Sequence, residues 1–378
     1  MSGILAVFRI ELGRILTLKP AFSVFVVAVL IYSVFYPQPY RAETLRDVPI
    51  ALVDQDGTDS SRQLARRIDA SADVAIVQSY PDQPTAEREV YARGLYGILV
   101  IPKNFERDLL HGRSSPIAIY ADASYFLIYQ RVSGAVAAVA RTMGAEVETA
   151  ILIAEHVDPA LATAAADPMP LTAVTLFNPQ GGYATYILPA AFVLILQQTL
   201  LIGVGLLGTY PNPKLDAISF EQIGAVSRVL GKLLAYLAIE TVVFAFYLLV
   251  LPYLYDIPRL GTPVTILLFS LPFILAVSSL GMVVAKLIRN PLILQLVTAA
   301  VGMPFLFISG FSWPIEAIPP ALHYVALALP STSAINGIVN IAQLGASIAD
   351  VRIYFITVVF LALGYGALAV IFEQRSRA

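Results

Sequence analysis

Long apolar stretches without charged residues recur along this chain. Five of them are long enough for a helix to cross a bilayer, which takes about 17–25 residues. These predicted membrane helices cover residues 182–210, 233–255, 260–285, 291–312 and 353–372. A shorter apolar stretch, Ala21–Tyr36, completes a sixth predicted membrane helix over residues 20–37. The pattern therefore predicts six membrane helices, with the first separated from the other five by a long polar segment.

The first apolar stretch is predicted to remain in the protein as a membrane anchor. A cleaved signal peptide is the alternative, but no Ala-x-Ala site follows the stretch and a long leader precedes it. Residues 1–19 predict an amphipathic helix at the cytoplasmic surface. Its apolar face is formed by Ile4, Leu5, Phe8, Leu12 and Ile15, opposite Arg9, Glu11 and Arg14. Such a helix can anchor the first span, contact a partner protein, or do both.

Basic residues are distributed unevenly between the two sides of the predicted membrane helices. One side carries Arg9, Arg14, Lys19, Lys214, Arg228, Lys232, Lys286, Arg289, Arg375 and Arg377. The short connections on the other side carry only Arg259 and Arg352. Because Lys and Arg favour the cytoplasmic side, we expect both termini to be cytoplasmic, including a tail at residues 373–378.

The stretch 315–352 is apolar but broken by prolines and polar residues, which include Pro319, Pro320, His323, Pro330, Ser331, Asn336 and Asn340. Backbone groups freed by so many interruptions could not all be satisfied in lipid. A seventh crossing here would also place the basic C-terminal tail on the outer side. We therefore predict two short helices, at about 318–328 and 332–345, that enter partway from the outer face.

Residues 38–181 are polar, with frequent charges and turn signals, and predict a water-soluble domain. Strand patterns alternate with helix patterns, which is typical of an α/β layer; the strands are predicted at 48–53, 73–79, 95–101 and 115–121. A long amphipathic helix is predicted from about 125 to 155, and a last strand near 170–177. The predicted fold is an α-helical polytopic membrane protein, with this extracytoplasmic α/β domain inserted before a transmembrane domain at 182–372.

Three acidic residues follow the first predicted strand, at Asp54, Asp56 and Asp59. An EF-hand calcium loop is one interpretation, but Gly57 comes too early for that pattern. We expect instead a tight turn, followed by a helix that is capped by Asp59 or Ser60.

Composition narrows the classes of function. The chain has 378 residues, of which 58% are hydrophobic and 13% charged, and its net charge is -2. No basic stripe interleaved with aromatic residues indicates nucleic-acid binding. There is no cysteine, and the three histidines lack the spacing of a zinc site, so we predict neither a metal site nor catalytic residues. The P-loop pattern is absent, so we expect no nucleotide or other cofactor in this chain, which is not predicted to be an enzyme.

The order of one membrane helix, a large outer domain and then five helices with a broken element before the last resembles the ABC-2 type transporter permeases with a large extracytoplasmic domain, as in type V exporters. Local motifs carry this resemblance. One is Phe177-Asn178-Pro179 followed by Ile187-Leu188-Pro189. Another is the run from Ser309-Gly310-Phe311 through Trp313-Pro314-Ile315-Glu316-Ala317 to Pro319-Pro320. Pro330-Ser331-Thr332 matches the start of the second short helix.

The resemblance implies the permease subunit of an ATP-driven ABC exporter in the bacterial inner membrane, with ATP and Mg²⁺ bound by a separate ATPase subunit. It also implies a dimer with a second permease, either an identical copy or a paralogue, a periplasmic adaptor protein, and an amphipathic or hydrophobic substrate. Contact with the ATPase is expected at Phe8, Arg9, Glu11 and Glu221. The loop with Glu221 is less charged than is usual in the family, which fits a specialised partner.

Glu240 lies near the centre of the third predicted span, where a charge costs at least a few kcal/mol. It is therefore expected to face protein or water. In one interpretation it contacts a substrate cation or a proton in the transport pathway. In the other it forms a hydrogen bond between helices; candidate partners are Gln197, Gln198 and Gln295. Phe305 and Phe307 are added to this predicted substrate pathway.

The resemblance places an outer gate or re-entrant motif at Ser309, Gly310, Phe311, Pro314, Glu316 and Pro319. Gly310 is equally suited to close packing between helices.

A non-transporting membrane scaffold or secretion component, whose outer domain binds a partner, is a different class of function. A simple anchor needs neither a central carboxylate nor a broken element, so the sequence favours a transporter. An intramembrane enzyme is not predicted, because the spans lack paired aspartates, a Ser-Lys pair or an HExxH motif.

Overall fold

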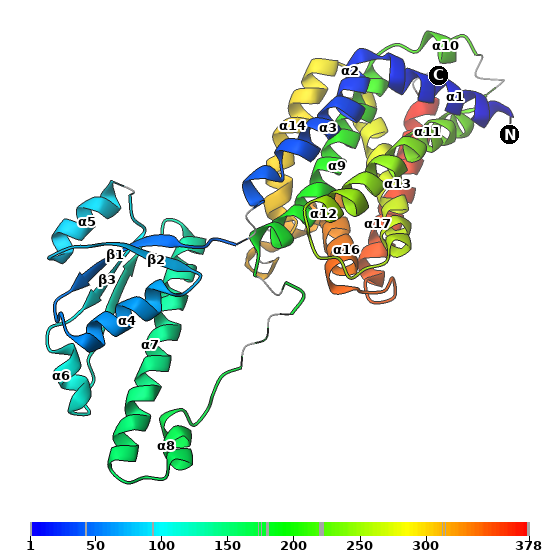
Figure 1. Cartoon of the computed structure of the whole chain (residues 1–378). Coiled ribbons are helices and arrows are strands. Elements are labelled where there is room, and N and C mark those ends of the chain that lie inside the picture. Colours follow the sequence, from blue (N-terminus) through cyan, green and yellow to red (C-terminus); the bar gives the residue numbers. More distant parts are fainter. Residues whose placement is uncertain are drawn as a thin grey trace. The chain divides into compact units, whose positions relative to one another are not determined.

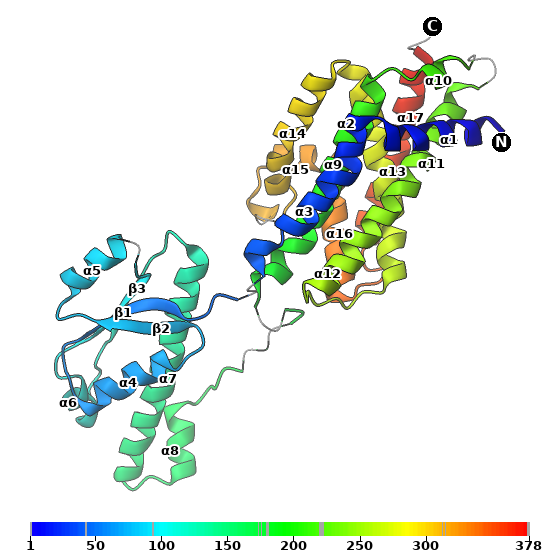
Figure 2. The same ribbon diagram turned by 45° about the horizontal axis from the view of Figure 1, so that its top comes forward.

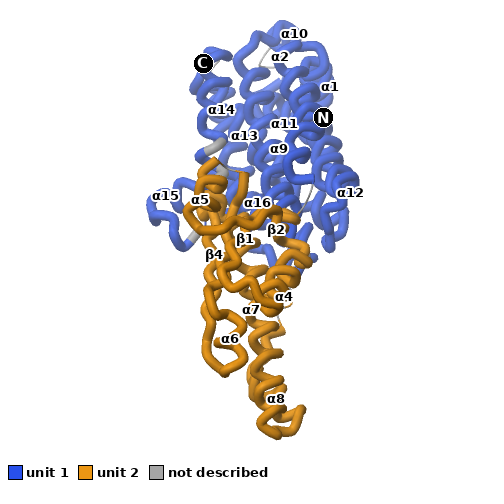
Figure 3. Tube along the Cα trace, turned by 60° about the vertical axis from the view of Figure 1, so that its left-hand side comes forward, with its two compact units in different colours: residues 1–43, 175–378 blue, residues 44–174 orange. Residues whose placement is uncertain are grey.

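The computed structural model describes residues 2–41, 44–92, 94–172, 174, 176–178, 181–218, 223–311, 313 and 315–375. The chain divides into two compact units (Figure 3). Unit 1 contains residues 1–43 and 175–378, and unit 2 contains residues 44–174. The chain therefore leaves unit 1 once, forms unit 2 and then returns.

Unit 2 is built on a small mixed sheet of four strands in the order β2-β1-β3-β4 (Figure 1). The strands are β1 (Val48–Asp54), β2 (Val74–Ser79), β3 (Gly97–Ile101) and β4 (Ala118–Ala121). β1 pairs in parallel with β2 and β3, and β4 is antiparallel to β3. The described residues of the segment 170–177 form no strand, so the strand predicted there is wrong. Its apolar side chains, such as Leu171 and Leu176, are exposed.

Helices cover both faces of this sheet: α4 (Asp59–Asp69), α5 (Gln83–Tyr91), α6 (Phe105–Leu110), α7 (Phe126–Ala154) and α8 (Pro159–Ala166). Side chains alternate along β1, so Ile50 packs in a cluster with residues of α4 and α7, whereas Ala51 packs in another with Ala86 of α5. α7 extends past the sheet, and α8 packs beside its second half (Figure 1).

The acidic turn after β1 is closed by its own hydrogen bonds. Asp54 Oδ1 accepts from the amides of Asp56 and Gly57 at 3.0 Å. Asp56 Oδ2 accepts from the hydroxyl of Thr58 at 2.6 Å and from the amide of Glu106 at 3.0 Å. Burial raises the pKa of Asp56, but these hydrogen bonds outweigh burial, and the pKa lies below its ordinary value. The cap of α4 is Thr58, not Asp59 or Ser60 as predicted.

Unit 1 is helical. It begins with α1 (Ser2–Thr17), α2 (Lys19–Phe22), a π-helical segment (Ser23–Ala28), α3 (Val29–Phe35) and a 3-10 turn (Gln38–Tyr40). After unit 2 come α9 (Tyr183–Thr209), α10 (Pro213–Asp216), α11 (Ala225–Ala245), a π-helical segment (Phe246–Val250), α12 (Leu251–Leu254) and α13 (Pro263–Leu287). The last part contains α14 (Pro291–Ile308), a 3-10 turn (Ile315–Ala317), α15 (Pro320–Leu327), α16 (Pro330–Leu344) and α17 (Arg352–Arg375).

Within the described ranges, five helical segments are long and apolar enough to cross a membrane: Lys19–Tyr40, Tyr183–Thr209, Ala225–Leu254, Pro263–Leu287 and Arg352–Arg375. α14 contains a shorter apolar helix, Pro291–Gly302. α15 and α16 meet at 81°, as in a broken span or a re-entrant loop. The chain is therefore a membrane protein with several apolar helices.

The third apolar helix begins earlier than the pattern predicts. The prediction placed its start at residue 233, whereas α11 begins at Ala225 and includes Arg228 and Lys232. A charge normally ends an apolar stretch, but Arg228 is fully buried and its guanidinium is hydrogen-bonded within the protein. The helix can therefore continue through it.

α9 lies at the centre of unit 1. In the most apolar stretch of α9, 78% is buried, compared with 11% in the corresponding stretch of α17. α9 packs against α13, α14 and α16. Gly208 makes one of these contacts possible, because a Cβ there would lie 2.5 Å from the Cβ of Ala285 on α13. Figure 2 shows α1, α10 and the C-terminal end of α17 together at one end of the unit.

The bent pair α15–α16 begins and ends at the same level of α9. Just before it, Phe311 accepts a hydrogen bond from the hydroxyl of Tyr186, in the first turn of α9. Near its end, Gln343 donates to the carbonyl of Thr185. At the bend, Ser331 contacts Gln197, halfway along α9, and Ala328 accepts from Tyr365, halfway along α17. The pair therefore runs inward to the middle of unit 1 and back again.

Candidate functional site

Glu240 is fully buried on α11. Tyr236 precedes it and Phe244 follows it by four residues, so the three side chains share one face of the helix. That face points into the bundle. Tyr236 stacks on Phe25 with 6.5 Å between the ring centroids, and Phe244 packs edge-on against Phe273 of α13 with 5.7 Å between the ring centroids. Neither carboxylate oxygen of Glu240 has a hydrogen-bond partner in the described part of the chain.

Of the three glutamines proposed as partners of Glu240, only Gln197 forms a hydrogen bond with another described side chain. Gln197 Nε2 donates to the hydroxyl of Ser331 on α16 at 2.9 Å. Gln198 lies against α14, because a Cβ at Gly302 would stand 2.5 Å from its Nε2. Gln295 is exposed on α14. The hydrogen bond expected between Glu240 and a glutamine is therefore not formed among the described residues.

Other buried polar side chains lie in the same helices and at the bend of the re-entrant pair. At the start of α16, Ser331, Thr332 and Ser333 are each exposed by 2% or less. Atoms without a hydrogen-bond partner among the described residues occur in Gln197, Gln198, Glu240, Ser278, Ser279 and Thr332. Unpartnered polar atoms in an apolar interior are costly, so this buried polar group can bind the polar part of a molecule or water.

The Ser309–Phe311 motif ends α14. Gly310 has a φ of 80°, in the left-handed region that glycine adopts without strain. The turn at Gly310 therefore favours glycine at this position. Ser309 is buried, and its carbonyl accepts from Asn336 Nδ2 at 3.4 Å. Phe311 stacks on Tyr186 at 5.0 Å, so the motif joins α14 to α16 and to the start of α9.

The remaining residues predicted for the pathway and gate are dispersed. Phe305 is half-buried, whereas Phe307 is 55% exposed and does not line the buried polar group. Glu316 and Pro319 are exposed, and Pro319 directly precedes α15. Pro314 lies outside the described residues.

A second polar cluster lies at the end of unit 1 that contains α1 and α10. Glu11 is only 1% exposed. Its Oε1 accepts from the hydroxyl of Tyr236 at 2.6 Å, its Oε2 accepts from Asn212 Nδ2 at 3.3 Å, and Arg14 lies 3.5 Å away. The cluster borders a cavity of about 280 Å³, where Lys286 and the buried Glu373 form an ion pair at 2.9 Å. Glu11 is thus buried within unit 1.

Arg228 holds the chain segment that leads into α11. Its guanidinium donates to three carbonyls, of Ile223 at 3.0 Å, of Leu215 at 3.3 Å and of Ile218 at 2.5 Å. The planar guanidinium has enough donors to bind all three, so one buried cation replaces the missing backbone partners of this segment. Glu221 belongs to the segment but lies outside the described residues.

α1 packs across α11 at a glycine. A Cβ at Gly231 would lie 2.6 Å from the Cβ of Val7, and Val7 is fully buried. Phe8 is half-buried against the core, and Arg9 is exposed. Among the residues predicted to contact a partner, Arg9 is therefore the one whose side chain is free at the surface of this described region.

We expect the substitution Tyr236→Phe to lower the free energy of unfolding by about 1.5–3 kcal/mol, because it removes a hydrogen bond to the buried carboxylate of Glu11. Thermal unfolding of the purified protein in detergent measures this effect. Tyr253→Phe is a matched control, since Tyr253 is 82% exposed, and it should leave the midpoint unchanged. Equal shifts in the two variants would contradict the assignment.

No group of three or more His, Cys, Asp or Glu side chains is placed to hold a metal ion within the described ranges.

Comparison with known proteins gives one family over nearly the whole chain. The model of a family described as ABC-2 family transporter protein matches residues 21–371. The linearmycin resistance permease protein LnrN of Bacillus subtilis (strain 168) is 24% identical over 399 residues, which cover 97% of this chain and 98% of LnrN. The probable multidrug ABC transporter permease YbhS of Escherichia coli (strain K12) is 22% identical over 158 residues, 41% of this chain and 42% of YbhS.

Proposed function

The chain belongs to the ABC-2 family of transporter proteins, and from this premise we propose that it is the permease subunit of an ATP-driven exporter. Permeases of this family are not themselves enzymes, and they work with a separate ATPase subunit that uses ATP. The observation that carries the proposal is the family match over residues 21–371, supported by an alignment with LnrN from end to end.

The proposed cargo is an amphipathic or hydrophobic compound that moves outward. The names of two relatives refer to linearmycin resistance and to multidrug transport, which supports a cargo of this kind. The buried polar atoms of Glu240 and Gln197, set within otherwise apolar helices, also suit a molecule with polar and apolar parts.

The proposed topology has six membrane helices in the bacterial inner membrane, with α14 as the fifth and α15–α16 as a re-entrant element entered from the outer side. Both termini and α10 are cytoplasmic, and unit 2 is extracytoplasmic. Contacts of the first turn of α9 with Phe311, which precedes α15, and with Gln343, near the end of α16, support the re-entrant assignment. The basic residues near α1, α10 and the C-terminal end of α17 support the orientation.

The proposed coupling surface for the ATPase consists of α1 and the segment around α10. Arg9 is exposed for direct contact, whereas Glu11 and Arg228 act by holding α1 and the α10 segment in position. A second permease, either another copy or a paralogue, completes the transporter, and a periplasmic adaptor binds unit 2.

Reconstitution tests the function. The chain, co-expressed with a candidate ABC ATPase subunit, should co-purify with it and accumulate an amphipathic fluorescent dye in inside-out vesicles when ATP is added. The control is an ATPase without its P-loop lysine. Failure to co-purify with any nucleotide-binding protein would contradict the proposal. An ATPase complex that moves no compound from a broad panel would favour the scaffold alternative.

Cysteine labelling tests the topology, because the natural chain has no cysteine to interfere. Ser114→Cys lies in unit 2 and Lys214→Cys in α10, and both positions are exposed. We expect a membrane-impermeant maleimide to label Ser114→Cys in intact spheroplasts, and Lys214→Cys only after the membrane is opened. The cysteine-free parent shows the background. The reverse pattern would invert the proposed orientation.

A further inference from the structure

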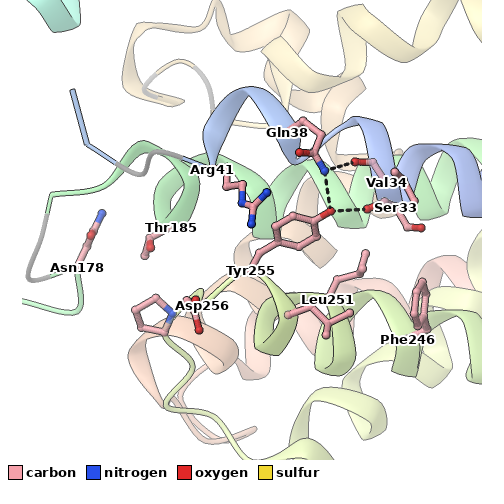
Figure 4. A pocket seen from close by; sticks show the side chains of 12 residues that line it. Ser33, Val34, Gln38, Arg41, Asn178, Thr185, Phe246, Leu251, Tyr255 and Asp256 are labelled. Atoms are coloured by element: carbon pink, nitrogen blue, oxygen red, sulfur yellow. Dashed lines mark hydrogen bonds between the residues drawn. The ribbon is translucent and has the colours of Figure 1, made fainter. Parts of the chain in front are cut away.

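A cavity of about 650 Å³ opens in unit 1 at the end away from α1 and α10 (Figure 4). Three parts of the chain line it: the end of α3 with the 3-10 turn after it, the approach to α9, and the end of the third apolar helix. All of its lining residues belong to unit 1. The volume is within the range of sites that bind small molecules.

The walls of this cavity change from apolar to polar along the helix axes. Val34 lies within α3, and Phe246 and Leu251 lie within the helical run from α11 to α12, so these side chains border the part that faces the helix interiors. Arg41 and Asp256 lie just beyond the ends of their helices, at the other part. Figure 4 shows this separation of charged and apolar side chains. The cavity therefore matches an amphiphile aligned with the helices.

One positive and one negative side chain border the polar part from different elements. Arg41 reaches in from the turn after α3, and Asp256 borders it after α12. Neither forms an ion pair with another described residue. Asp256 has a φ of 54°, a strained conformation for a residue with a side chain, and this backbone geometry holds the carboxylate at the cavity edge. Both charges are available to a ligand.

Tyr255 fixes the separation of the two helices that form the cavity. Its hydroxyl accepts from Gln38 Nε2 and donates to the carbonyl of Ser33, both at 3.3 Å (Figure 4). Gln38 Nε2 also donates to the carbonyl of Val34 at 2.9 Å. Because these bonds join the end of the first span to the end of the third, the cavity is preformed.

We propose that this cavity binds a phospholipid with a zwitterionic headgroup of the phosphatidylethanolamine type. The phosphate pairs with Arg41 and the ammonium group with Asp256, while the start of an acyl chain lies along Val34 and Leu251. The charges on the wall cancel, as do those of this headgroup. An anionic lipid would leave Asp256 without a counter-charge and would be repelled by it. The proposed lipid site does not depend on the proposed export function.

Native mass spectrometry of the purified full-length chain tests this site. The protein is loaded with equal amounts of phosphatidylethanolamine and phosphatidylglycerol, and the lipid that remains bound is counted. We expect phosphatidylethanolamine to be retained about tenfold better by the natural chain, and Arg41→Gln and Asp256→Asn each to lower its retention about tenfold, as for the loss of one charge-assisted hydrogen bond. Arg259→Gln is the matched control, because Arg259 is close in sequence but does not line the cavity.

A second variant distinguishes a lost lipid contact from a loss of folding. Leu254→Trp narrows the apolar wall at a residue that is already 60% exposed, so it should reduce lipid retention and leave the unfolding temperature unchanged. Equal retention of the two lipids by the natural chain would overturn the proposal. So would unchanged retention in both charge variants, or an equal loss in Arg259→Gln. A change of transport in Arg41→Gln with unchanged lipid retention would assign the cavity to the cargo and also overturn it.

Discussion

Replacement of Glu240 by Gln is expected to lower ATP-driven export by about tenfold or more while the purified protein remains folded. The buried carboxyl group of Glu240 has no hydrogen-bond partner among the described residues, so an amide of the same size removes a titratable group and no internal contact. What is lost is the capacity to bind a cationic group of the cargo or to carry a proton. One charge-assisted hydrogen bond accounts for a rate change of this size.

Transport in vesicles and thermal unfolding must be measured together for this variant. We expect the unfolding temperature to stay the same or to rise, because the uncharged amide is easier to bury. Thr241→Val is the control from the same helix, since the hydroxyl of Thr241 bonds only to the carbonyl of Leu237 one turn earlier. Unchanged transport at unchanged expression would show that Glu240 has no role in the pathway.

Replacement of Arg228 by Ala is expected to release the segment before α11 and to abolish binding of the ATPase. Three carbonyls would lose their buried donor at once, which should lower the free energy of unfolding by about 3 kcal/mol or more. Arg228→Lys should recover part of the stability, because one ammonium group keeps the charge but cannot match the planar set of donors.

Co-purification of the ATPase and thermal unfolding measure the effect of Arg228→Ala. Lys103→Ala is the matched control, because it removes an exposed cation from unit 2, away from the proposed coupling surface. It should change neither measurement. If Arg228→Ala retained the ATPase at the level of Lys103→Ala, the segment around α10 would not be part of the coupling surface.

The architecture was accessible from the sequence because local patterns determine it. Short apolar runs bounded by turn signals indicated β1 and β3, and long uncharged stretches indicated α9, α13 and α17. Prolines at 319, 320 and 330 indicated the break that the structure places between α15 and α16. Each of these signals lies within the element that it predicts.

The polar contacts could not be predicted, because they join residues far apart in the chain. Gln197 was expected near Glu240, yet it bonds to Ser331, which is 134 positions away. Arg228 was counted as the end of a loop, although its burial depends on three carbonyls that no local pattern reveals. Gln295 was predicted as a partner of the buried Glu240, but the apolar pattern of α14 does not indicate which of its faces packs against α9.

The prediction of a last strand in unit 2 was wrong for a related reason. Apolar residues between 170 and 177 suggested a strand, but a strand needs a sheet edge that accepts it, and the described residues there make no such pairing. A sequence pattern describes the segment and not the availability of its partner.

The contacts of Glu11 also impose an order on the synthesis of the protein. Its carboxylate depends on Asn212 and Tyr236, which follow it by 201 and 225 positions. While the ribosome is still making unit 2, Glu11 has Arg14 beside it on α1, but the amide of Asn212 and the hydroxyl of Tyr236 have not yet been made. The first span is therefore made while α1 is not yet docked on α11. The contacts of Glu11 with Asn212 and Tyr236 form only after α11 has been translated.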